Sequence, residues 1–452
     1  MTTLWAKQAL LAEGWAENVA VTLSGDRITE IAVGVAPQGQ RVGLLLPAPT
    51  NLHSHAFQRA MAGLTERRGP NPRDSFWTWR QLMYRFLDRL TPEDVEAIAA
   101  FVQMEMAEAG YAAVAEFHYL HHAPDGVAYA DRAEMATRIA AAAEQTGLGL
   151  TLLPVLYEFG GCDGRALGPG QNRFGNTPDQ FAALLAGAET ALASLPRDTV
   201  LGVAPHSLRA VSVDGLAFAA SLRADAPIHM HLAEQVAEVE ELLAHRGARP
   251  TEWLLANANV DARWCLIHCT QMEAHETKGL AASGAVAGLC PITESSLGDG
   301  IFDGVSYLSQ GGRWGIGSDS NIRIALSEEL RTLDYSQRLR DRSRAALASA
   351  EKSTGRALFE AAAQGGAQAA GRDAGTIAAG KLADLVALDI SGPDMAGHHG
   401  DTLLDAFIFA GDDRMVKELW SGGRHLVSDG QHYAQAAITQ RYLDTVMKLR
   451  EL

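Results

Sequence analysis

The sequence has few cysteines and no long apolar run. Its 452 residues include only four cysteines, Cys162, Cys265, Cys269 and Cys290, and no two of them form a CxxC pair. This pattern argues against a disulfide framework or a cysteine-rich zinc site and favours a reducing, cytoplasmic compartment. No stretch reaches the ~20 uninterrupted apolar residues of a transmembrane helix. The first residues lack the basic and apolar regions of a signal peptide, so we expect none.

Basic residues are also scarce relative to acidic ones. The chain carries 38 Lys and Arg against 54 Asp and Glu, which gives a formal net charge of -16 at pH 7. Nucleic acids and anionic membranes need a basic surface, so this balance disfavours both as partners. An anionic small substrate remains compatible, because it responds to a local arginine and not to the net charge. A homodimer is the expected assembly, since it is the commonest oligomer of soluble proteins.

Short apolar runs recur along the chain, and most gaps between them hold Ala-, Leu- and Glu-rich segments with helical periodicity. Eight strands that alternate with helices predict an α/β fold, a (β/α)8 barrel of the TIM type. A doubly wound open sheet is the structural alternative, but no GxGxxG follows the first run to support a nucleotide-binding version of it. The expected barrel strands are Leu44–Pro47, Ala112–Phe117, Leu150–Leu156, Val200–Ala204, Ile228–Leu232, Trp264–His268, Val286–Cys290 and Trp314–Ser318.

Both ends of the chain read as short β segments with glycine turns. Residues 18–33 and 380–423 carry these segments, and we infer that the two ends meet in one small β-sandwich domain. The predicted division is residues 1–48 and 375–438 for the small β domain, 49–374 for the barrel and 439–452 for a C-terminal helix.

Histidine and acidic residues gather where the expected strands end. His53 and His55 follow the first run, and at i and i+2 of an extended segment their imidazoles project into one space. The chemistry of a barrel lies at the carboxyl ends of its strands, so further side chains there should face the same space. They are His206, His229, His231, Glu234, His268 and Asp319.

Four of these residues form the donor set of a catalytic metal. His53, His55, His231 and Asp319 provide three nitrogens and one oxygen and leave room for a water molecule. A zinc-like ion would lower the pKa of that water to roughly 7 and give hydroxide at neutral pH.

Two other groups complete the expected chemistry. Glu234, three residues after His231, is placed to shuttle a proton between the water and a leaving group. His268 could donate a hydrogen bond to the developing charge or polarise the substrate. His229 shares the face of His231, and a core or supporting role is its favoured interpretation.

The combined pattern resembles the amidohydrolase superfamily. The resemblance rests on His53-Ser54-His55, His231-x-x-Glu234, His268, Ser318-Asp319-Ser320 and the Gly-Lys-Leu-Ala-Asp of residues 380–384. The order and spacing match the deaminase branch, and the chain contains no lysine between His55 and His231 that could be the carboxylated lysine of binuclear members. The resemblance therefore implies one divalent metal ion, as in cytosine, adenosine and guanine deaminases. Zinc is the expected metal, although iron, nickel and cobalt accept similar ligands.

Residues 51–64, 76–80, 115–119, 204–212 and 290–294 resemble the members of that branch that act on N-formimino-L-glutamate. The resemblance implies hydrolysis to N-formyl-L-glutamate and ammonia in histidine degradation, with Glu234, His268 and Asp319 as catalytic residues. A substrate with two carboxylates needs fixed cations, and arginine suits them because its planar fork matches a carboxylate. Arg209, after the fourth run, and Arg80, in a Trp-rich loop after the first, are the candidates. By resemblance Gln58, Tyr119 and His206 complete the substrate contacts.

Three alternatives remain open at this stage. Another mononuclear deaminase of the branch could act on a purine, a pterin or a guanidino compound. Glu294 stands where purine and triazine hydrolases of the family tend to carry Asn, which disfavours those substrates without giving Glu294 a role. A barrel kept as a non-catalytic scaffold should have lost part of the constellation, and all six metal and proton-transfer positions are present. A regulatory role on nucleic acid is weaker still on charge.

Overall fold

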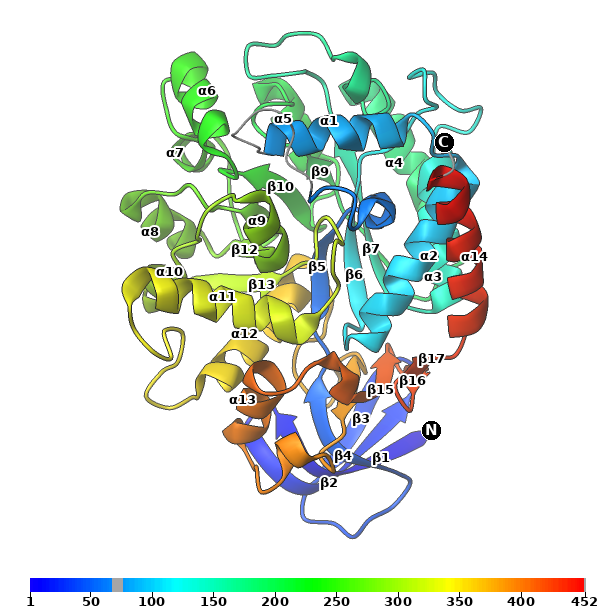
Figure 1. The fold of residues 1–452 in the computed structure, drawn as a ribbon, viewed down its shortest axis with the longest axis vertical. Helices are drawn as coiled ribbons and strands as arrows, with labels where there is room; N and C mark the ends of the chain where they lie inside the picture. The colour runs from blue at the N-terminus through cyan, green and yellow to red at the C-terminus, as the bar shows by residue number, and fades with distance from the viewer. Residues whose placement is uncertain (67–75, 451–452) are drawn as a thin grey trace.

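The larger part of the molecule is a barrel of parallel strands ringed by helices (Figure 1). The computed structural model describes residues 1–66 and 76–450. Two runs of paired strands, β5-β6-β7-β8 and β10-β11-β12-β13, meet through parallel bridges at Val203/Ile228 and Ser54/Asp319, which closes the (β/α)8 barrel. Its strands are β5 (Thr50–Ser54), β6 (Ala113–His118), β7 (Gly149–Leu156), β8 (Val200–Leu201), β9 (Ala204–Pro205), β10 (Ile228–Leu232), β11 (Trp264–His268), β12 (Val286–Leu289) and β13 (Arg313–Ile316).

The predicted first strand is wrong. Leu44–Pro47 belongs to β4 (Gln40–Pro47), which pairs with strands of the small β domain, and the first barrel strand is β5. The run Leu44–Pro47 at the end of β4 is buried because its two faces serve two cores. Leu44 and Leu46 pack into the core of the barrel, whereas Leu45 packs into that of the small domain. The other seven runs contain strands, and Gly202 and Val203 interrupt the fourth of them between β8 and β9.

Helices follow most of the barrel strands and cover the outside of the barrel. α1 (Phe76–Leu87) begins within the segment that was predicted as a Trp-rich loop, so Arg80 lies on a helix; the side chain of Trp77 is outside the described residues. The other helices of this part are α2 (Pro92–Glu108), α3 (Glu134–Thr146), α4 (Pro178–Leu192), α5 (Val213–Ser221), α6 (Val236–Arg246), α7 (Pro250–Asn257), α8 (Ala274–Ser283), α9 (Pro291–Leu297), α10 (Gly304–Ser309), α11 (Leu326–Asp341) and α12 (Thr354–Ala369), with short 3-10 turns at Ala56–Met61 and Pro169–Gln171.

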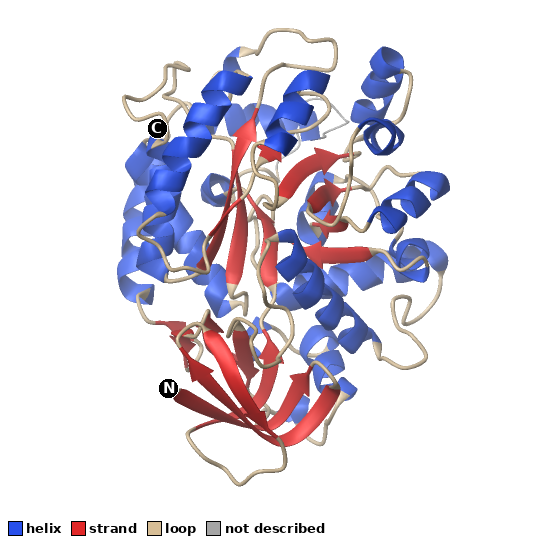
Figure 2. Cartoon of the chain, turned by 180° about the vertical axis from the view of Figure 1, so that it is seen from behind, coloured by secondary structure: helices blue, strands red, loops and turns tan. Residues whose placement is uncertain are grey.

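The two chain ends form the small β-sandwich domain at one end of the barrel (Figure 2). Its strands are ordered β17-β16-β15-β14-β4-β1-β2-β3, and each neighbouring pair is antiparallel except β1 and β4. They are β1 (Thr2–Leu11), β2 (Gly14–Ser24), β3 (Arg27–Ala32), β4, β14 (Leu385–Leu388), β15 (Val416–Ser421), β16 (Arg424–Ser428) and β17 (Gln431–His432), with α13 (Asp401–Phe409) and 3-10 turns at Pro393–Met395 and Asp413–Met415. The domain boundaries at residues 48, 374 and 438 stay a prediction.

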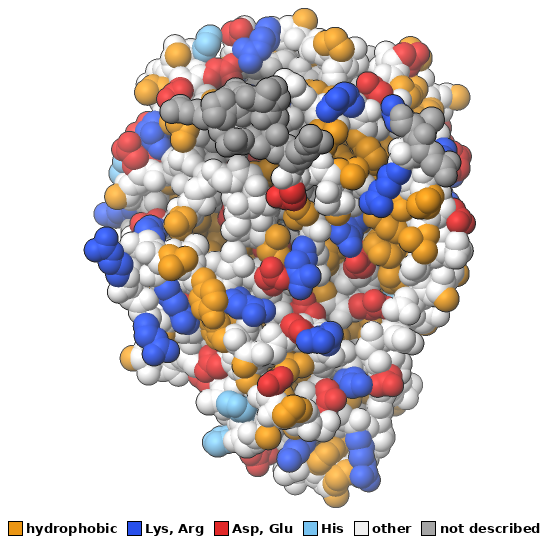
Figure 3. Space-filling model, in the orientation of Figure 1, with side chains coloured by type: hydrophobic (Ala, Val, Ile, Leu, Met, Phe, Trp, Pro, Cys, Tyr) orange, Lys and Arg blue, Asp and Glu red, His pale blue; other side chains and the backbone are white. Residues whose placement is uncertain are grey.

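The last described element is α14 (Gln435–Arg450), which returns to the barrel and lies along α2 (Figure 1). The rings of Tyr442 and Phe101 stack there with centroids 3.9 Å apart, and Arg441 bonds Glu96 at 2.7 Å. On the face seen in Figure 3, basic and acidic side chains are interspersed. Within residues 1–66 and 76–450, no helix combines the length and the apolar character needed to cross a membrane.

Candidate active site

Four donor side chains converge at the carboxyl end of the barrel. His53 lies in β5, His55 directly follows that strand, His231 lies in β10, and Asp319 follows β13. All four are buried, and their donor atoms lie within 4.8 Å of one another. The Nε2 atom of His53 is 3.1 Å from that of His231 and 3.4 Å from Oδ1 of Asp319, which in turn is 3.3 Å from Nε2 of His55.

The ends of β5 and β13 are tied together by backbone and side-chain hydrogen bonds. The backbone N–H of Asp319 donates to the carbonyl of His53 at 2.9 Å, and that of His55 donates back to the carbonyl of Asp319 at 3.0 Å. Asn321 donates to the His55 carbonyl at 3.1 Å and accepts from Ser318. Asp319 and Asn321 both have positive φ, 46° and 53°, which is a strained conformation for residues with a side chain. These bonds hold three donors in register.

The second ring nitrogens decide which imidazole atoms face the centre. Nδ1 of His55 donates to the Phe117 carbonyl at 3.0 Å, and Nδ1 of His231 donates to the His206 carbonyl at 3.3 Å. A carbonyl only accepts, so in both rings the proton is on Nδ1 and a bare Nε2 lone pair points inward. With Zn–N bonds of ~2.05 Å, donors at the corners of a tetrahedron lie about 3.3 Å apart. The three separations given above, 3.1–3.4 Å, fit one such cation.

Burial and charge set the protonation of the donors. Burial lowers the pKa of His53 to about 3, although the neighbouring Asp319 acts in the opposite direction. Burial lowers the pKa of His55 and of His231 as well. Burial alone would raise the pKa of Asp319, but the hydrogen bond from His53 helps to hold this pKa below its usual range. Neutral imidazoles and an ionised carboxylate are the forms that bind a metal.

Glu234 stands just beyond β10, in a loop held by a second carboxylate. Glu238, fully buried on α6, accepts the backbone N–H groups of Ala233 at 3.3 Å and Glu234 at 3.0 Å. Ala233 has φ of 50°, a left-handed turn that redirects the chain at this point. The Glu234 carboxylate lies 3.9 Å from Nε2 of His268 and 3.9 Å from Nη2 of Arg209. Burial raises the pKa of Glu234.

His268 ends β11 with φ of 72° and is fixed by Glu294. Its Nδ1 lies 3.3 Å from Oε1 of Glu294, and its Nε2 lies 3.9 Å from both Glu234 and Asp319. The same Glu294 oxygen accepts the backbone N–H of Cys290 at 2.8 Å. Burial would lower the pKa of His268, but the charge of Glu234 and the bond to Glu294 outweigh it and raise this pKa to about 10. His268 is thus a donor that faces the reacting space.

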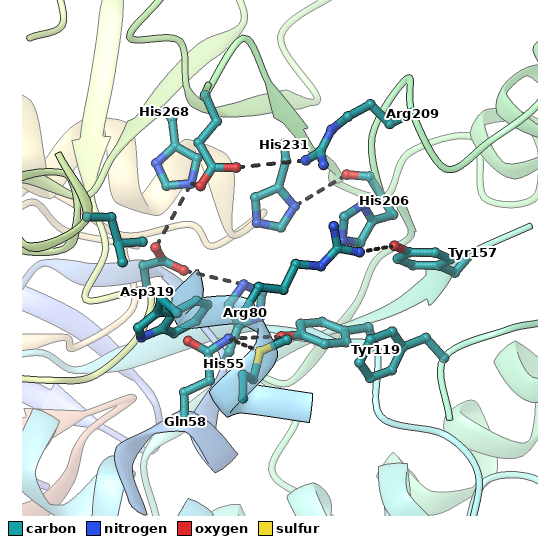
Figure 4. A pocket seen from close by; sticks show the side chains of 15 residues that line it. His55, Gln58, Arg80, Tyr119, Tyr157, His206, Arg209, His231, His268 and Asp319 are labelled. Carbon is teal, nitrogen blue, oxygen red and sulfur yellow. Dashed lines mark hydrogen bonds and ion pairs between the residues drawn. The ribbon is translucent and has the colours of Figure 1, made fainter. Parts of the chain in front are cut away.

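The five predicted substrate contacts all line one cavity over the metal ligands (Figure 4). Gln58 donates to the hydroxyl of Tyr119 at 2.8 Å, and the ring of His206 lies 5.0 Å from that of His231. The residues that line the cavity are His55, Gln58, Trp79, Arg80, Met83, Tyr119, Tyr157, Phe174, His206, Arg209, His231, Glu234, His268, Leu297 and Asp319.

The two arginines enter this cavity from different elements. Arg80 on α1 donates to the hydroxyl of Tyr157 at 3.3 Å and lies over the ring of Tyr84. Arg209, between β9 and α5, is buried and lies 3.9 Å from Glu234 and 4.0 Å from Glu238. Figure 4 shows the side chains of Arg80 and Arg209 on the side of the cavity that carries His206. The cavity therefore combines a negative metal side with a positive side.

Two functional neighbours were missed in the sequence. Tyr157 follows β7 and could have been found by the same strand-end rule that found the histidines. Glu294 was noted without a role, and only the fold brings it to His268. His229 is a core histidine as expected: it is fully buried and its Nε2 donates to the Ala369 carbonyl at 2.7 Å, and it does not line the cavity.

Comparisons with known proteins agree with this geometry. The model of the amidohydrolase family matches residues 44–426, and that of the N-terminal domain of the formimidoylglutamate deiminase HutF matches residues 1–41. The chain is 48% identical to a formimidoylglutamate deiminase of Pseudomonas aeruginosa over 99% of this chain and 100% of that one. A crystal structure of an amidohydrolase from Brucella melitensis, 48% identical, superimposes with a TM-score of 0.96 over 100% of both chains. A zinc-bound adenosine deaminase from Xanthomonas campestris shares the fold, with a TM-score of 0.82 at 21% identity over 100% of this chain and 99% of that one.

Proposed function

Because the chain belongs to the amidohydrolase family, we propose that it is a hydrolase that converts N-formimino-L-glutamate and water to N-formyl-L-glutamate and ammonia. The observation that carries this proposal is one cavity with the metal ligands on one side and two arginines on the other. A full-length relative at 48% identity is a formimidoylglutamate deiminase, which supports the same substrate. A neutral purine or pterin ring carries no carboxylate to match the two arginines that line the cavity.

The donor set fits one divalent ion, and we propose zinc. His53, His55, His231 and Asp319 would hold it, and the zinc bound by the adenosine deaminase of the same fold is in keeping with this choice. When bound there, the ion would supply a water activated for attack at neutral pH.

Glu234 serves as the proton shuttle of the reaction. In its ionised form the carboxylate accepts a proton from the attacking water. It delivers that proton to the formimino nitrogen, then accepts the second proton of the former water and passes it to the same nitrogen as the C–N bond breaks. The nitrogen leaves as ammonia, and the carbon retains the water oxygen as the formyl carbonyl. The raised pKa of Glu234 suits both steps, because general acid–base catalysis is most effective when the pKa is near the working pH.

His268 and the pocket side chains orient the substrate. Nε2–H of His268 donates to the oxygen that adds to the reacting carbon, where negative charge develops, and Glu294 keeps the ring turned toward it. Arg80 and Arg209 take the two carboxylates, since each offers a planar fork of donors. Gln58, Tyr119 and His206 supply neutral donors around the same cavity. A small-molecule dicarboxylate is thus the partner we propose, and the homodimer stays a prediction.

The proposal is tested by ammonia release from a substrate panel. Metal-loaded protein is assayed with N-formimino-L-glutamate, a guanidino acid and an aminopurine at equal concentrations. We expect kcat/KM for the formimino dicarboxylate to exceed that of the purine by on the order of 10⁴, because buried donors reject a ligand that cannot satisfy them. A faster reaction with the purine or the guanidino acid would assign the site to another deaminase.

A further inference from the structure

Tyr157, which follows β7 and lines the cavity, is held in place by both its backbone and its ring. Its backbone exchanges two hydrogen bonds with Asn176: the N–H of Tyr157 donates to Oδ1 at 3.2 Å, and its carbonyl accepts the Asn176 N–H at 3.0 Å. The ring lies 4.4 Å from that of His206 and 5.7 Å from that of Phe174. The hydroxyl is therefore presented to the cavity in one orientation.

Two side chains donate to the hydroxyl oxygen of Tyr157. Arg80 donates through Nη2 at 3.3 Å and Gln171 through Nε2 at 2.9 Å. Gln171 is itself fixed, because its Oε1 accepts the backbone N–H of Gly168 at 2.9 Å. Two N–H donors occupy the oxygen lone pairs, so the hydroxyl proton must be donated in another direction. Within the part of the chain that the structure describes, no acceptor bonds that proton, and Tyr157 lines the cavity (Figure 4).

We propose that the Tyr157 hydroxyl donates to a carboxylate of the substrate beside Arg80, and so is a further specificity-determining residue of this pocket. The inference rests on the proposed function, because it takes the ligand to be a dicarboxylate. Tyr157 and Arg80 lie within hydrogen-bond distance of each other, so one neutral and one charged donor can serve the two oxygens of a single carboxylate. Gln171 acts through Tyr157 as a positioning residue.

The first test is Tyr157→Phe, which removes the hydroxyl and keeps the ring. A hydrogen bond to a charged group is worth about 10- to 100-fold in binding, so KM for N-formimino-L-glutamate should rise by that factor with kcat unchanged. Tyr307→Phe is the matched control, since this buried hydroxyl bonds the Arg313 carbonyl at 3.1 Å and does not line the cavity. It should leave KM unchanged.

Substrate analogues with only one carboxylate show whether the Tyr157 hydroxyl binds a carboxylate. N-formimino-4-aminobutanoate lacks the α-carboxylate of the substrate, and N-formimino-2-aminobutanoate lacks the γ-carboxylate. The increase in KM caused by Tyr157→Phe should disappear for one analogue and persist for the other. An equal increase in KM with both analogues would overturn the assignment, because it would show that the hydroxyl affects packing or contacts the formimino group.

Binding of the product separates this inference from the proposed function. Calorimetry with N-formyl-L-glutamate needs no turnover. If the wild type releases no ammonia from N-formimino-L-glutamate but Tyr157→Phe weakens product binding at least about 10-fold, the function fails and the role of Tyr157 stands. If turnover is normal and Tyr157→Phe matches the wild type in both KM and Kd, the function stands and the role of Tyr157 falls.

Discussion

Glu234 is the residue on which the proposed proton transfers depend. It lies outside the four donors, so Glu234→Gln should keep metal binding and lose turnover. General acid–base catalysis contributes typically 10²–10⁴-fold, so we expect kcat to fall by about 10³ with the metal content unchanged. Metal analysis and steady-state kinetics on the same preparation measure both quantities.

The control for this substitution is Glu240→Gln, an exposed carboxylate on the neighbouring helix α6. It should match the wild type. Full activity in Glu234→Gln would remove Glu234 from the mechanism, and loss of metal would show that this side chain supports the ligands instead.

Arg209 links substrate binding to the protonation of Glu234. Burial raises the pKa of Glu234, and the nearby charge of Arg209 counteracts that rise. Glu234 must be ionised to accept a proton, so activity is lost as the pH falls below its pKa. Arg209→Ala should therefore move the acid limb of the kcat/KM profile to higher pH, and raise KM for the dicarboxylate roughly 100-fold through the lost ion pair.

Arg197→Ala, at an exposed arginine, is the control and should change neither quantity. An unchanged KM in Arg209→Ala would show that the carboxylates bind elsewhere. An acid limb of the kcat/KM profile that moved to lower pH in Arg209→Ala would contradict the electrostatic coupling of Arg209 and Glu234.

Single residues were predictable where the chemistry requires a particular side chain at a strand end. His53, His231 and Asp319 could be listed from the sequence because few residue types bind a metal. Glu294 could not be given its role, because it lies on helix α9 whereas its partner His268 ends β11, and only the closed barrel brings the two within 3.3 Å.

At the scale of elements, apolar runs located seven barrel strands and misplaced the first. β4 and β5 are separated by two residues, and Leu44–Pro47 at the end of β4 is buried as β5 is, so the sequence offered no means of telling which of the two strands belongs to the barrel. The helix α1 was also missed, since its start is rich in aromatic residues, which are typical of strands and loops as well.

The close contact of β5 with the end of β13 gives a prediction about Gly317. A Cβ atom at this position would lie 2.7 Å from the backbone N and O atoms and from Cβ of His53, so the backbone at His53 would have to shift. Gly317→Ala should push β5 outward, weaken metal binding and destabilise the fold by about 2 kcal/mol, as overpacking typically does. Thermal unfolding and metal titration measure these effects.

Gly392→Ala is the control, because a Cβ atom at Gly392 meets no atom within 4 Å. It should leave both the unfolding temperature and the metal affinity close to those of the wild type. Wild-type metal binding in Gly317→Ala would contradict the close approach of the two strand ends.

At the scale of the whole molecule, a buried ion cluster joins the barrel to the small β domain. Arg372, after the last barrel helix, donates to Asp198 at 2.9 Å and to Asp384 at 2.9–3.0 Å. Arg424 of β16 donates to Asp198 at 2.8 Å. Arg372 is fully buried, and its charge therefore depends on these partners.

Asp198→Asn should destabilise the protein by about 3 kcal/mol at neutral pH. This is the lower end of the usual range for breaking a buried ion pair, because Arg372 still pairs with Asp384 in the variant. Burial would raise the pKa of Asp198, but hydrogen bonds from Arg424 and the charge of Arg372 hold it at about 2. A carboxyl group whose pKa is lower in the folded than in the unfolded state stabilises the fold at pH values above its unfolded pKa of about 4. This stabilisation is lost as the pH falls to the folded pKa of about 2. Denaturant unfolding should therefore show the gap between variant and wild type closing over this range.

Asp373→Asn is the control, because this carboxylate pairs with Arg27 and Lys381 at the surface. Its effect should stay below about 1 kcal/mol. A gap between Asp198→Asn and wild type that did not change between pH 4 and 2 would contradict the role of the Asp198 charge in joining the two domains.

The central claim is that this site removes the formimino nitrogen of N-formimino-L-glutamate as ammonia. The most direct measurement follows substrate labelled with ¹³C at the formimino carbon by NMR, with ammonia assayed in the same sample of metal-loaded protein. We predict that the label appears in N-formyl-L-glutamate, with one ammonia for each molecule formed. Label in formamide together with free glutamate, or no reaction with metal bound, would contradict the account.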